Sequence, residues 1–168
     1  MHSETDREFA NYYGRLCHGL FGIYPSAAKL KDRKAVNLII SRTDLVEFCV
    51  SLGLPIGNKI NHGLDVPPWI KENPAYARAC LRGLVDTDGS VFTHRYRSAG
   101  KWYEYKKLDF CTLSKPLLNS AYAVFIANKM SPYVAQGKKL RLESKKDIKQ
   151  YFRVIGSSNQ KHLKRYVQ

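Results

Sequence analysis

A repeated segment is the feature of this sequence that most constrains its fold. Residues 41–53 and 144–156 share Ser, Asp, apolar and Gly positions, and every shared position is offset by 103 residues. Each copy has apolar residues three and four apart and ends at a glycine, which is typical of a helix. Apolar runs at 35–40 and 138–142 precede the two helices and indicate strands. The chain is therefore expected to contain a duplicated strand–helix unit.

The second copy is preceded by further predicted elements. Residues 73–85 begin with Asn-Pro and continue with small and apolar residues, a pattern that predicts a capped helix. Before this helix, residues 66–69 (Val-Pro-Pro-Trp) indicate an extended linker. After it, residues 90–97 and 102–112 flank a short Ser-Ala-Gly segment and predict a β-hairpin.

The first copy lacks these preceding elements. A helix and hairpin equivalent to those of the second copy would fall before Met1, and the chain begins instead with a helix over about residues 5–21. We therefore expect two parts. Residues 1–72 form a partial first repeat without its motif helix and hairpin, and residues 73–168 form a repeat with the motif helix, hairpins and a C-terminal helix.

The charge distribution points to a polyanionic partner. Residues 1–80 hold ten basic and eight acidic side chains, whereas residues 81–168 hold eighteen and six. Lys and Arg neutralise phosphates and release condensed counterions, so nucleic acid is the usual partner of such a chain. A basic surface that only confers solubility is the alternative.

Aromatic residues alternate with cations in the predicted hairpin, a mixture suited to phosphates, sugars and base edges. Side chains two residues apart in a strand point the same way, so Arg95 and Arg97 should share one face of the sheet. We expect this sheet to grip duplex nucleic acid in a groove. The expected binding side chains are Arg95, Arg97, Lys101, Tyr103, Tyr105, Lys107 and Lys139.

Composition excludes several classes of protein. An apolar content of 44% with 25% charged residues indicates a globular chain with a core, and excludes disordered and collagen-like classes. The sequence has no long apolar run and no secretory signal, so we expect no membrane span and a cytoplasmic or organellar location, not secretion. Four cysteines without a Cys-x-x-Cys pair, each in an apolar stretch, indicate reduced core thiols.

The nonapeptide at residues 81–89 (Leu-Arg-Gly-Leu-Val-Asp-Thr-Asp-Gly) carries the chemistry. Gly83 lets a second helix approach closely, and Leu81 and Leu84 supply apolar contacts beside it. Asp88 falls where the helix ends, which leaves a carboxylate at a cleft. Oxygen ligands of this kind suit Mg²⁺. Most Asp-x-Asp-Gly segments, however, only cap turns and helix ends.

The nonapeptide resembles the motif of the LAGLIDADG homing endonucleases. The matching positions are Leu81, Gly83, Leu84, Asp86, Asp88 and Gly89, with Val85 a conservative substitute and Arg82 and Thr87 departing from the literal motif. The similarity extends over about residues 36–165. It implies an α+β fold in which an antiparallel saddle-shaped sheet, with helices packed on one side, grips the DNA major groove.

The resemblance also implies roles for individual residues. In this family the last Asp of each motif binds metal, so Asp88 is the expected catalytic ligand of Mg²⁺ or another divalent cation, assisted by the Thr87 carbonyl. The residues expected at the interface between motif helices are Leu81, Gly83, Leu84 and Asp86. Lys161 is a candidate catalytic lysine, because a cation at the cleft stabilises charge that develops on the phosphate. A solvent-exposed lysine without a catalytic role is the alternative.

The implied function is site-specific cleavage of double-stranded DNA by metal-dependent phosphodiester hydrolysis at a long recognition site, of the type that mobilises introns or inteins. The alternative is a non-cutting nucleic-acid binder, such as a group I intron RNA maturase, or a degenerate fragment. Enzymes of this kind need two motif helices, and this chain has one motif, at residues 81–89. We therefore expect activity only with a second motif helix, from a homodimer or from a complementing upstream segment.

Overall fold

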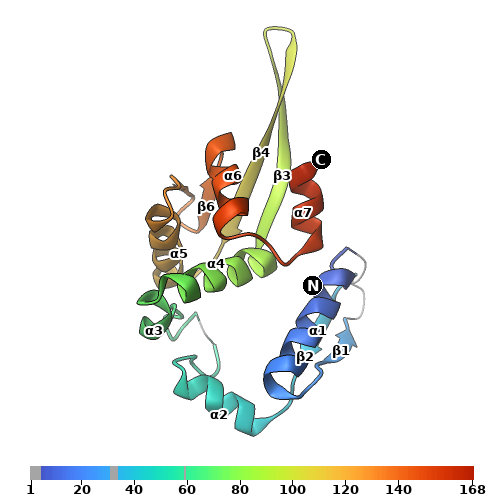
Figure 1. Ribbon diagram of the computed structural model, residues 1–168, viewed down its shortest axis with the longest axis vertical. Coiled ribbons are helices and arrows are strands. Elements are labelled where there is room, and N and C mark those ends of the chain that lie inside the picture. Colours follow the sequence, from blue (N-terminus) through green and yellow to red (C-terminus); the bar gives the residue numbers. More distant parts are fainter. Residues whose placement is uncertain (1–4, 31–33, 59) are drawn as a thin grey trace.

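The computed structural model describes residues 5–30, 34–58 and 60–168, and it combines helices with antiparallel sheets (Figure 1). In chain order the elements are α1 (Arg7–Phe21), β1 (Ser26–Lys29), β2 (Val36–Ile39), α2 (Thr43–Ser51), α3 (Pro68–Lys71), α4 (Pro74–Asp88), β3 (Gly89–Ser98), β4 (Lys101–Cys111), α5 (Lys115–Ala127), β5 (Tyr133–Ala135), β6 (Lys139–Leu142), α6 (Lys145–Val154) and α7 (Gln160–Val167). The expected α+β class is confirmed.

The main sheet has four antiparallel strands in the order β3-β4-β6-β5. Strands β3 and β4 form a long hairpin, joined by Ala99 and Gly100 with φ angles of 46° and 79°. Positive φ at both central residues is the geometry of a tight two-residue hairpin turn, which matches the natural twist of the strands. The outer part of the hairpin projects beyond α6 and α7 (Figure 1).

Helices α4, α5, α6 and α7 pack on one face of this sheet, as expected from the resemblance. The register places Val91 beside Leu108 and Leu108 beside Leu142, and all three are fully buried. Leu81 of α4, Phe125 of α5 and Tyr151 of α6 complete this core. The motif helix α4 is therefore anchored by its own apolar side chains to the base of the hairpin.

The order helix, strand, strand, helix occurs twice, as α1-β1-β2-α2 and as α5-β5-β6-α6. In both units the two strands are antiparallel neighbours. In the second unit the main sheet also contains β3 and β4, and α4 covers it. Among residues 5–30, 34–58 and 60–72 the structure contains no counterpart of α4, β3 or β4.

Equivalent positions in the two units differ in burial. Tyr151 of α6 is 0% exposed, whereas Phe48, the equivalent residue of α2, is 50% exposed. Ile148 is likewise buried in α6, while its counterpart Leu45 is only half-buried. None of the residues of α2 is buried. The first unit therefore leaves uncovered an apolar surface that the second unit buries.

The segment expected to be an extended linker is partly helical. Pro68–Lys71 forms the single helical turn α3, because proline suits the first turn of a helix. The Trp69 indole Nε1 donates a hydrogen bond of 2.9 Å to the Leu52 carbonyl, which ties this turn to the end of α2. The short strands β1 and β5 were not predicted, because they lack the apolar runs that precede the two repeated helices and that predicted β2 and β6.

The four cysteines are all free thiols, but they are not all in the core. Cys17 is buried, Cys49 and Cys80 are half-buried, and Cys111 is exposed at the end of β4. The expectation of core thiols is therefore wrong for Cys111. No helix in the described ranges is long and apolar enough to cross a membrane.

Candidate metal site and nucleic-acid surface

Helix α4 is well defined at both ends. The Asn73 side chain accepts hydrogen bonds from the backbone N–H of Ala75 (2.9 Å) and Tyr76 (3.3 Å), and Pro74 occupies the first helical position. At the other end the chain passes directly from helix to strand at Gly89. A Cβ atom at this position would collide with the Val85 carbonyl oxygen, so only glycine permits this close approach. Asp88 is thereby held as the last residue of the helix.

Asp88 and Thr87 place oxygen atoms at the carboxyl-terminal end of α4. The Asp88 side chain is exposed, and its Oδ2 accepts a hydrogen bond of 3.0 Å from the Thr87 hydroxyl. The last four carbonyls of a helix lack partners within it. Of these, the Val85 carbonyl accepts from the Gly89 N–H and the Asp86 carbonyl accepts from Asn159. The Thr87 carbonyl is one of the two that remain.

These oxygens fit one half of a divalent cation site. The carboxyl end of a helix carries partial negative charge, which attracts a cation and adds to the charge of the Asp88 carboxylate. Hard cations such as Mg²⁺ prefer carboxylate and carbonyl oxygens. In the described parts of the chain, however, no group of three metal-ligating side chains converges. A complete site would need a second carboxylate from elsewhere.

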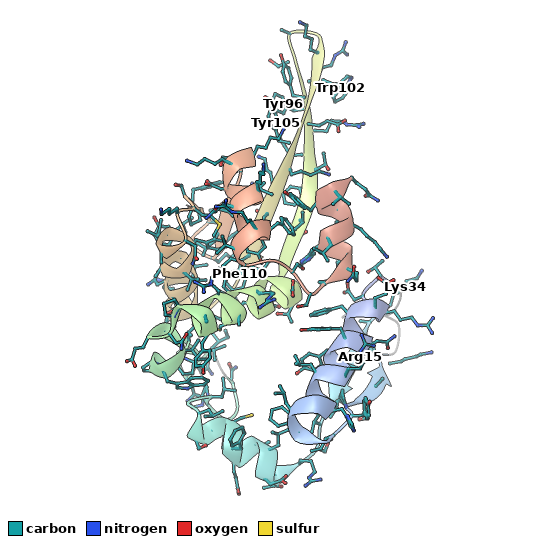
Figure 2. All side chains as sticks on the ribbon, viewed as in Figure 1. Arg15, Lys34, Tyr96, Trp102, Tyr105 and Phe110 are labelled. Carbon is teal, nitrogen blue, oxygen red and sulfur yellow. The ribbon has the colours of Figure 1, made fainter. Side chains whose placement is uncertain are left out.

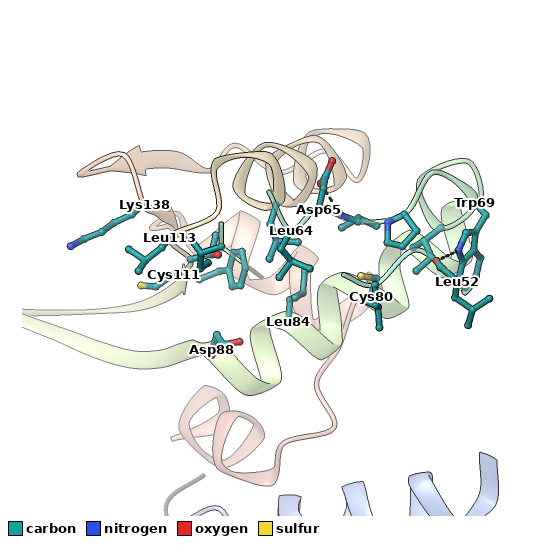
Figure 3. A pocket seen from close by; sticks show the side chains of 18 residues that line it. Leu52, Leu64, Asp65, Trp69, Cys80, Leu84, Asp88, Cys111, Leu113 and Lys138 are labelled. Atoms are coloured by element: carbon teal, nitrogen blue, oxygen red, sulfur yellow. Dashed lines mark hydrogen bonds between the residues drawn. The ribbon is translucent and has the colours of Figure 1, made fainter. Parts of the chain in front are cut away.

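Asp88 lies at one end of a cavity of about 730 Å³ beside α4 (Figure 3). Across the cavity from Asp88 are Cys111, Leu113 and Lys138. Most of the remaining lining is aliphatic or aromatic and comes from the 52–70 segment and from α4 itself. The carboxylate therefore borders an apolar surface, not a polar pocket closed by this chain alone.

The exposed face of α4 carries a row of small residues, with the exposed Tyr76 near its start. Ala75, Ala79, Gly83 and Thr87 follow one another at intervals of four, and all are exposed. A Cβ added at Gly83 would meet no atom within 4 Å. Small side chains at this spacing allow another helix to approach closely. Leu84 is half-buried beside this face.

The expected interface of four residues needs correction. Leu81 and Asp86 are buried inside this chain, at 1% and 4% exposure, because α4 turns them toward its own sheet and toward α6 and α7. Only Gly83 and Leu84 remain accessible to a second helix.

Asp86 joins α4 to the segment between α6 and α7. Its Oδ1 accepts a hydrogen bond of 2.5 Å from the Ser157 hydroxyl, and its Oδ2 accepts one of 2.7 Å from the Ser158 backbone N–H. The buried His162 places its Nδ1 3.7 Å from Asp86 Oδ1. Burial, followed by the charge of Asp86, raises the pKa of Tyr151 well above its usual value. Asp86 therefore ties α4 to the α6–α7 segment of its own chain, instead of lying at an interface between motif helices.

The expected nucleic-acid-binding side chains divide between the two faces of the hairpin. Arg95 and Arg97 share a face, as expected, but it is the face that continues from the helix-covered Val91. The other five, Lys101, Tyr103, Tyr105, Lys107 and Lys139, lie by strand alternation on the opposite face. The cause is the turn, which pairs Ser98 with Lys101, so that odd residues of β3 oppose even residues of β4. The outer hairpin projects beyond the helices, and both arginines are exposed.

Tyrosines cluster on the second of these faces. Tyr96 stacks on Tyr103 with ring centroids 5.4 Å apart and on Tyr105 at 5.9 Å. A hydrogen bond with Tyr105, together with slight desolvation, raises the pKa of Tyr96. Trp102 lies on the other side of the hairpin and is 65% exposed (Figure 2). The hairpin thus presents aromatic rings on both faces.

Several expected binding cations form ion pairs within the chain. Lys107 bonds to Glu143 at 2.6 Å, Lys139 lies 3.1 Å from Asp109, and Arg95 pairs with Glu104. Within residues 5–30, 34–58 and 60–168, Arg97 and Lys101 form no ion pair. These two cations are therefore the most available to phosphates.

Arg141 belongs to the same surface but was not expected there. It bonds to both carboxylate oxygens of Asp109, at 2.5 and 2.8 Å, and its guanidinium lies 5.7 Å from the ring centre of Phe92. Burial opposes ionisation of Asp109, but hydrogen bonds from Arg141 and Lys139 outweigh it and lower the pKa of this carboxyl. Arg141 lies two residues after Lys139 in the sequence, and this spacing is the signal that could have placed Arg141 on the same face.

Lys161 does not point freely into solvent. Its ammonium group pairs with Asp6 at the start of α1, and Lys164 pairs with Glu8 at 3.1 Å. These contacts join α7 to α1. A catalytic role for Lys161 would require it to exchange Asp6 for a phosphate.

The structural neighbours of this chain are LAGLIDADG homing endonucleases. I-LtrWI bound to target DNA is similar with a TM-score of 0.44 and 20% identity, covering 54% of this chain and 34% of that one. I-GzeII in complex with a DNA target has a TM-score of 0.40 and 23% identity, covering 54% and 31%. I-TnaI has a TM-score of 0.40 and 13% identity, covering 60% and 67%.

This chain therefore spans about a third of the length of I-LtrWI and of I-GzeII. A comparison with protein-family models finds no match, and a comparison with curated proteins finds none either.

Proposed function

We propose that this chain is a site-specific endonuclease of double-stranded DNA that hydrolyses phosphodiester bonds with a divalent cation, once a second motif helix joins α4. The observation that carries the proposal is the position of Asp88, an exposed carboxylate at the end of the motif helix, directly before the hairpin. The match of residues 81–89 to the LAGLIDADG motif supports hydrolysis as the reaction.

The sheet and hairpin are the proposed DNA-binding surface. The hairpin offers Arg97 and Lys101 for phosphate contacts, and the tyrosines and Trp102 for sugars and base edges. Ion-paired cations such as Lys107 and Lys139 can exchange their carboxylate partners for phosphates, and these contacts position the duplex. Contacts of phosphates with Arg97 and Lys101 release counterions, so binding weakens steeply as the salt concentration rises.

Asp88 and the Thr87 carbonyl are the proposed ligands of Mg²⁺. When bound between such oxygens, the cation activates water and stabilises negative charge on the phosphate. Asp88 supplies the charge that retains the cation, and α4 fixes its direction through the anchored Leu81 and Val85. Lys161, released from Asp6, would stabilise charge on the phosphate.

The chain supplies one such carboxylate, whereas cleavage of both strands calls for two. The small-residue face of α4 supports the pairing of two motif helices, from a second copy of the chain or from a complementing segment. The uncovered apolar surface of α1-β1-β2-α2 supports the second source, because α4, β3 and β4 cover the equivalent unit in residues 73–168.

A non-cutting nucleic-acid binder is the second candidate, and the single carboxylate favours it. The test incubates the purified chain with Mg²⁺ and a plasmid that carries the uninterrupted insertion locus of its own gene. We expect linear plasmid where the wild type has a second motif helix, from a second copy of the chain or from an added complementing segment, and none with Asp88→Asn, while both proteins retard the same duplex. If the wild type retards the duplex without cleaving it, even after a segment that carries a second motif helix is added, the non-cutting binder is favoured.

A further inference from the structure

Helix α6 carries a row of cations on its outward face that the proposed DNA surface does not use. Lys145, Lys146, Lys149 and Arg153 are all exposed. They span nine residues, or about 12 Å of helix. In the described ranges none of the four forms an ion pair, and Arg153 only donates a hydrogen bond to Gln150. We call these four residues the α6 cation row.

Six of the fourteen other cations of residues 81–168, among them Arg95, have acidic partners. Lys107, Lys139 and Arg141 pair with acidic residues of the sheet, and Lys161 and Lys164 pair with α1. The α6 cation row is therefore the densest group of uncompensated positive charge along one element of the structure.

The fold of this helix does not require these cations. The positions of α2 that correspond to Lys149 and Arg153 are Val46 and Val50, which are 47% and 39% exposed. Like charges four residues apart destabilise a helix by about 0.2–0.5 kcal/mol per pair. Cations in the first turn also oppose the helix dipole. The row thus carries a cost that no ion pair among the described residues offsets.

The row faces away from the hairpin surface. Ile148 and Tyr151 of α6 point into the core against the sheet, so the residues on the other side of the helix point away from it. Sheet and helix together separate the row from the open sheet face by on the order of 15–20 Å. A straight duplex that lies on the open face cannot also reach α6.

We propose that the α6 cation row binds the phosphate backbone of a second DNA duplex, so that the protein bridges two DNA segments. The α6 cation row itself consists of ammonium and guanidinium groups, which suit phosphates and do not read bases. Phe152 of α6 is half-buried and stacked on Tyr166, so its ring is not free to stack on unpaired RNA bases. The inference rests on the proposed DNA binding by the sheet, which supplies the first duplex.

The test uses the non-cleaving Asp88→Asn chain and two duplexes, one with a donor and one with an acceptor fluorophore. Energy transfer between them reports bridging, and anisotropy of one labelled duplex reports binding of a single duplex. In this background K145Q/K149Q/R153Q neutralises the α6 cation row while keeping good helix formers. The matched control R15Q/K29Q/K115Q removes three exposed cations from α1, β1 and α5, so that the net charge is the same.

We expect bridging to fall by on the order of tenfold in the α6 variant at moderate salt, and to persist in the control. Single-duplex affinity should stay close to that of the parent in both. Equal bridging by the α6 variant and the control would overturn the proposal. A homodimer that bridges two duplexes through its two sheets would give this result. If duplex RNA competes for the α6 cation row more strongly than duplex DNA does, the assignment of this surface to DNA is overturned.

A third variant, R97Q/K101Q/K106Q, separates this inference from the proposed function. Loss of single-duplex binding in that variant supports docking on the hairpin. Unchanged single-duplex binding would contradict docking on the hairpin, while the comparison of the α6 variant with its control would still report on the row.

Discussion

Asp88 is a carboxylate at the carboxyl-terminal end of a helix, where the helix dipole is also negative. Without a cation this arrangement costs the folded chain about 0.3–1 kcal/mol. We therefore expect Asp88→Asn to raise the free energy of unfolding by that amount while abolishing cleavage. Urea denaturation in a metal-free buffer measures the first effect. A lower stability for Asp88→Asn would show that this carboxylate serves the fold instead of a cation.

Asp86 should behave in the opposite way, because it is buried and accepts hydrogen bonds from Ser157 and Ser158. Asp86→Asn turns one acceptor into a donor that faces these donors. Hydrogen bonds to a charged group are worth about 1.5–3 kcal/mol each, so we expect a loss of about 2–4 kcal/mol in unfolding free energy. Asp88→Asn is the matched control in the same denaturation experiment. Equal stability of the two variants would refute this role for Asp86.

The carboxyl group of Asp109 predicts a pH dependence. Its pKa is lowered in the folded chain, against the opposing effect of burial, by hydrogen bonds from Arg141 and Lys139. The unfolded value is about 3.9. A lowered folded pKa contributes stability that is present above about pH 4 and is lost as pH falls through the folded pKa. Asp109→Asn should therefore flatten the stability curve below about pH 4, measured by thermal melting.

Local patterns and the repeat predicted several helices and strands but missed β1, α3 and β5. Asn73, Pro74 and the apolar spacing predicted α4, and the repeat predicted β2, α2, β6 and α6. The division of the binding residues between two hairpin faces was not predictable, because it depends on the register. A two-residue turn at Ala99 and Gly100 pairs Arg95 with Glu104, and a turn one residue longer would change the facing side chains.

The candidate site was predictable only in part. The position of Asp88 at the end of the motif helix predicted a carboxylate at a cleft, whereas Asp86 was expected at the interface between motif helices and is instead buried within its own chain. The partner of Lys161 was not predictable, because Asp6 is 155 residues away in the sequence. Which residues of α4 face outward depended on how the helix packs on its own sheet, which turned Leu81 inward and left Gly83 open.

Gly83 supplies a prediction at the scale of the element. Its position in α4 is open, so a larger side chain meets no atom of this chain. Gly83→Ala should stabilise the isolated chain by about 0.8 kcal/mol through helix propensity. Gly83→Leu should keep the fold but hold a second helix away, and so abolish cleavage and association. Circular dichroism melting and sedimentation together test this, and an active, associated Gly83→Leu variant would exclude a close helix pair at Gly83.

At the scale of the whole molecule, the two halves differ in how much apolar surface they bury. Residues 73–168 hold nearly all of the buried core, whereas α2 buries none of its residues. An exposed apolar surface of this kind usually marks a site of protein contact. Residues 73–168 thus form a covered core and carry the motif carboxylate Asp88, whereas the first unit needs a partner to cover its apolar surface.

The central claim is that cleavage needs two motif helices, of which this chain supplies one. Analytical ultracentrifugation of the purified chain with and without its target duplex, combined with cleavage by the same samples in Mg²⁺, tests it most directly. We predict double-strand breaks only in samples where two copies, or one copy and a complementing segment, sediment together on the duplex. A strictly monomeric species that still makes double-strand breaks would contradict the account.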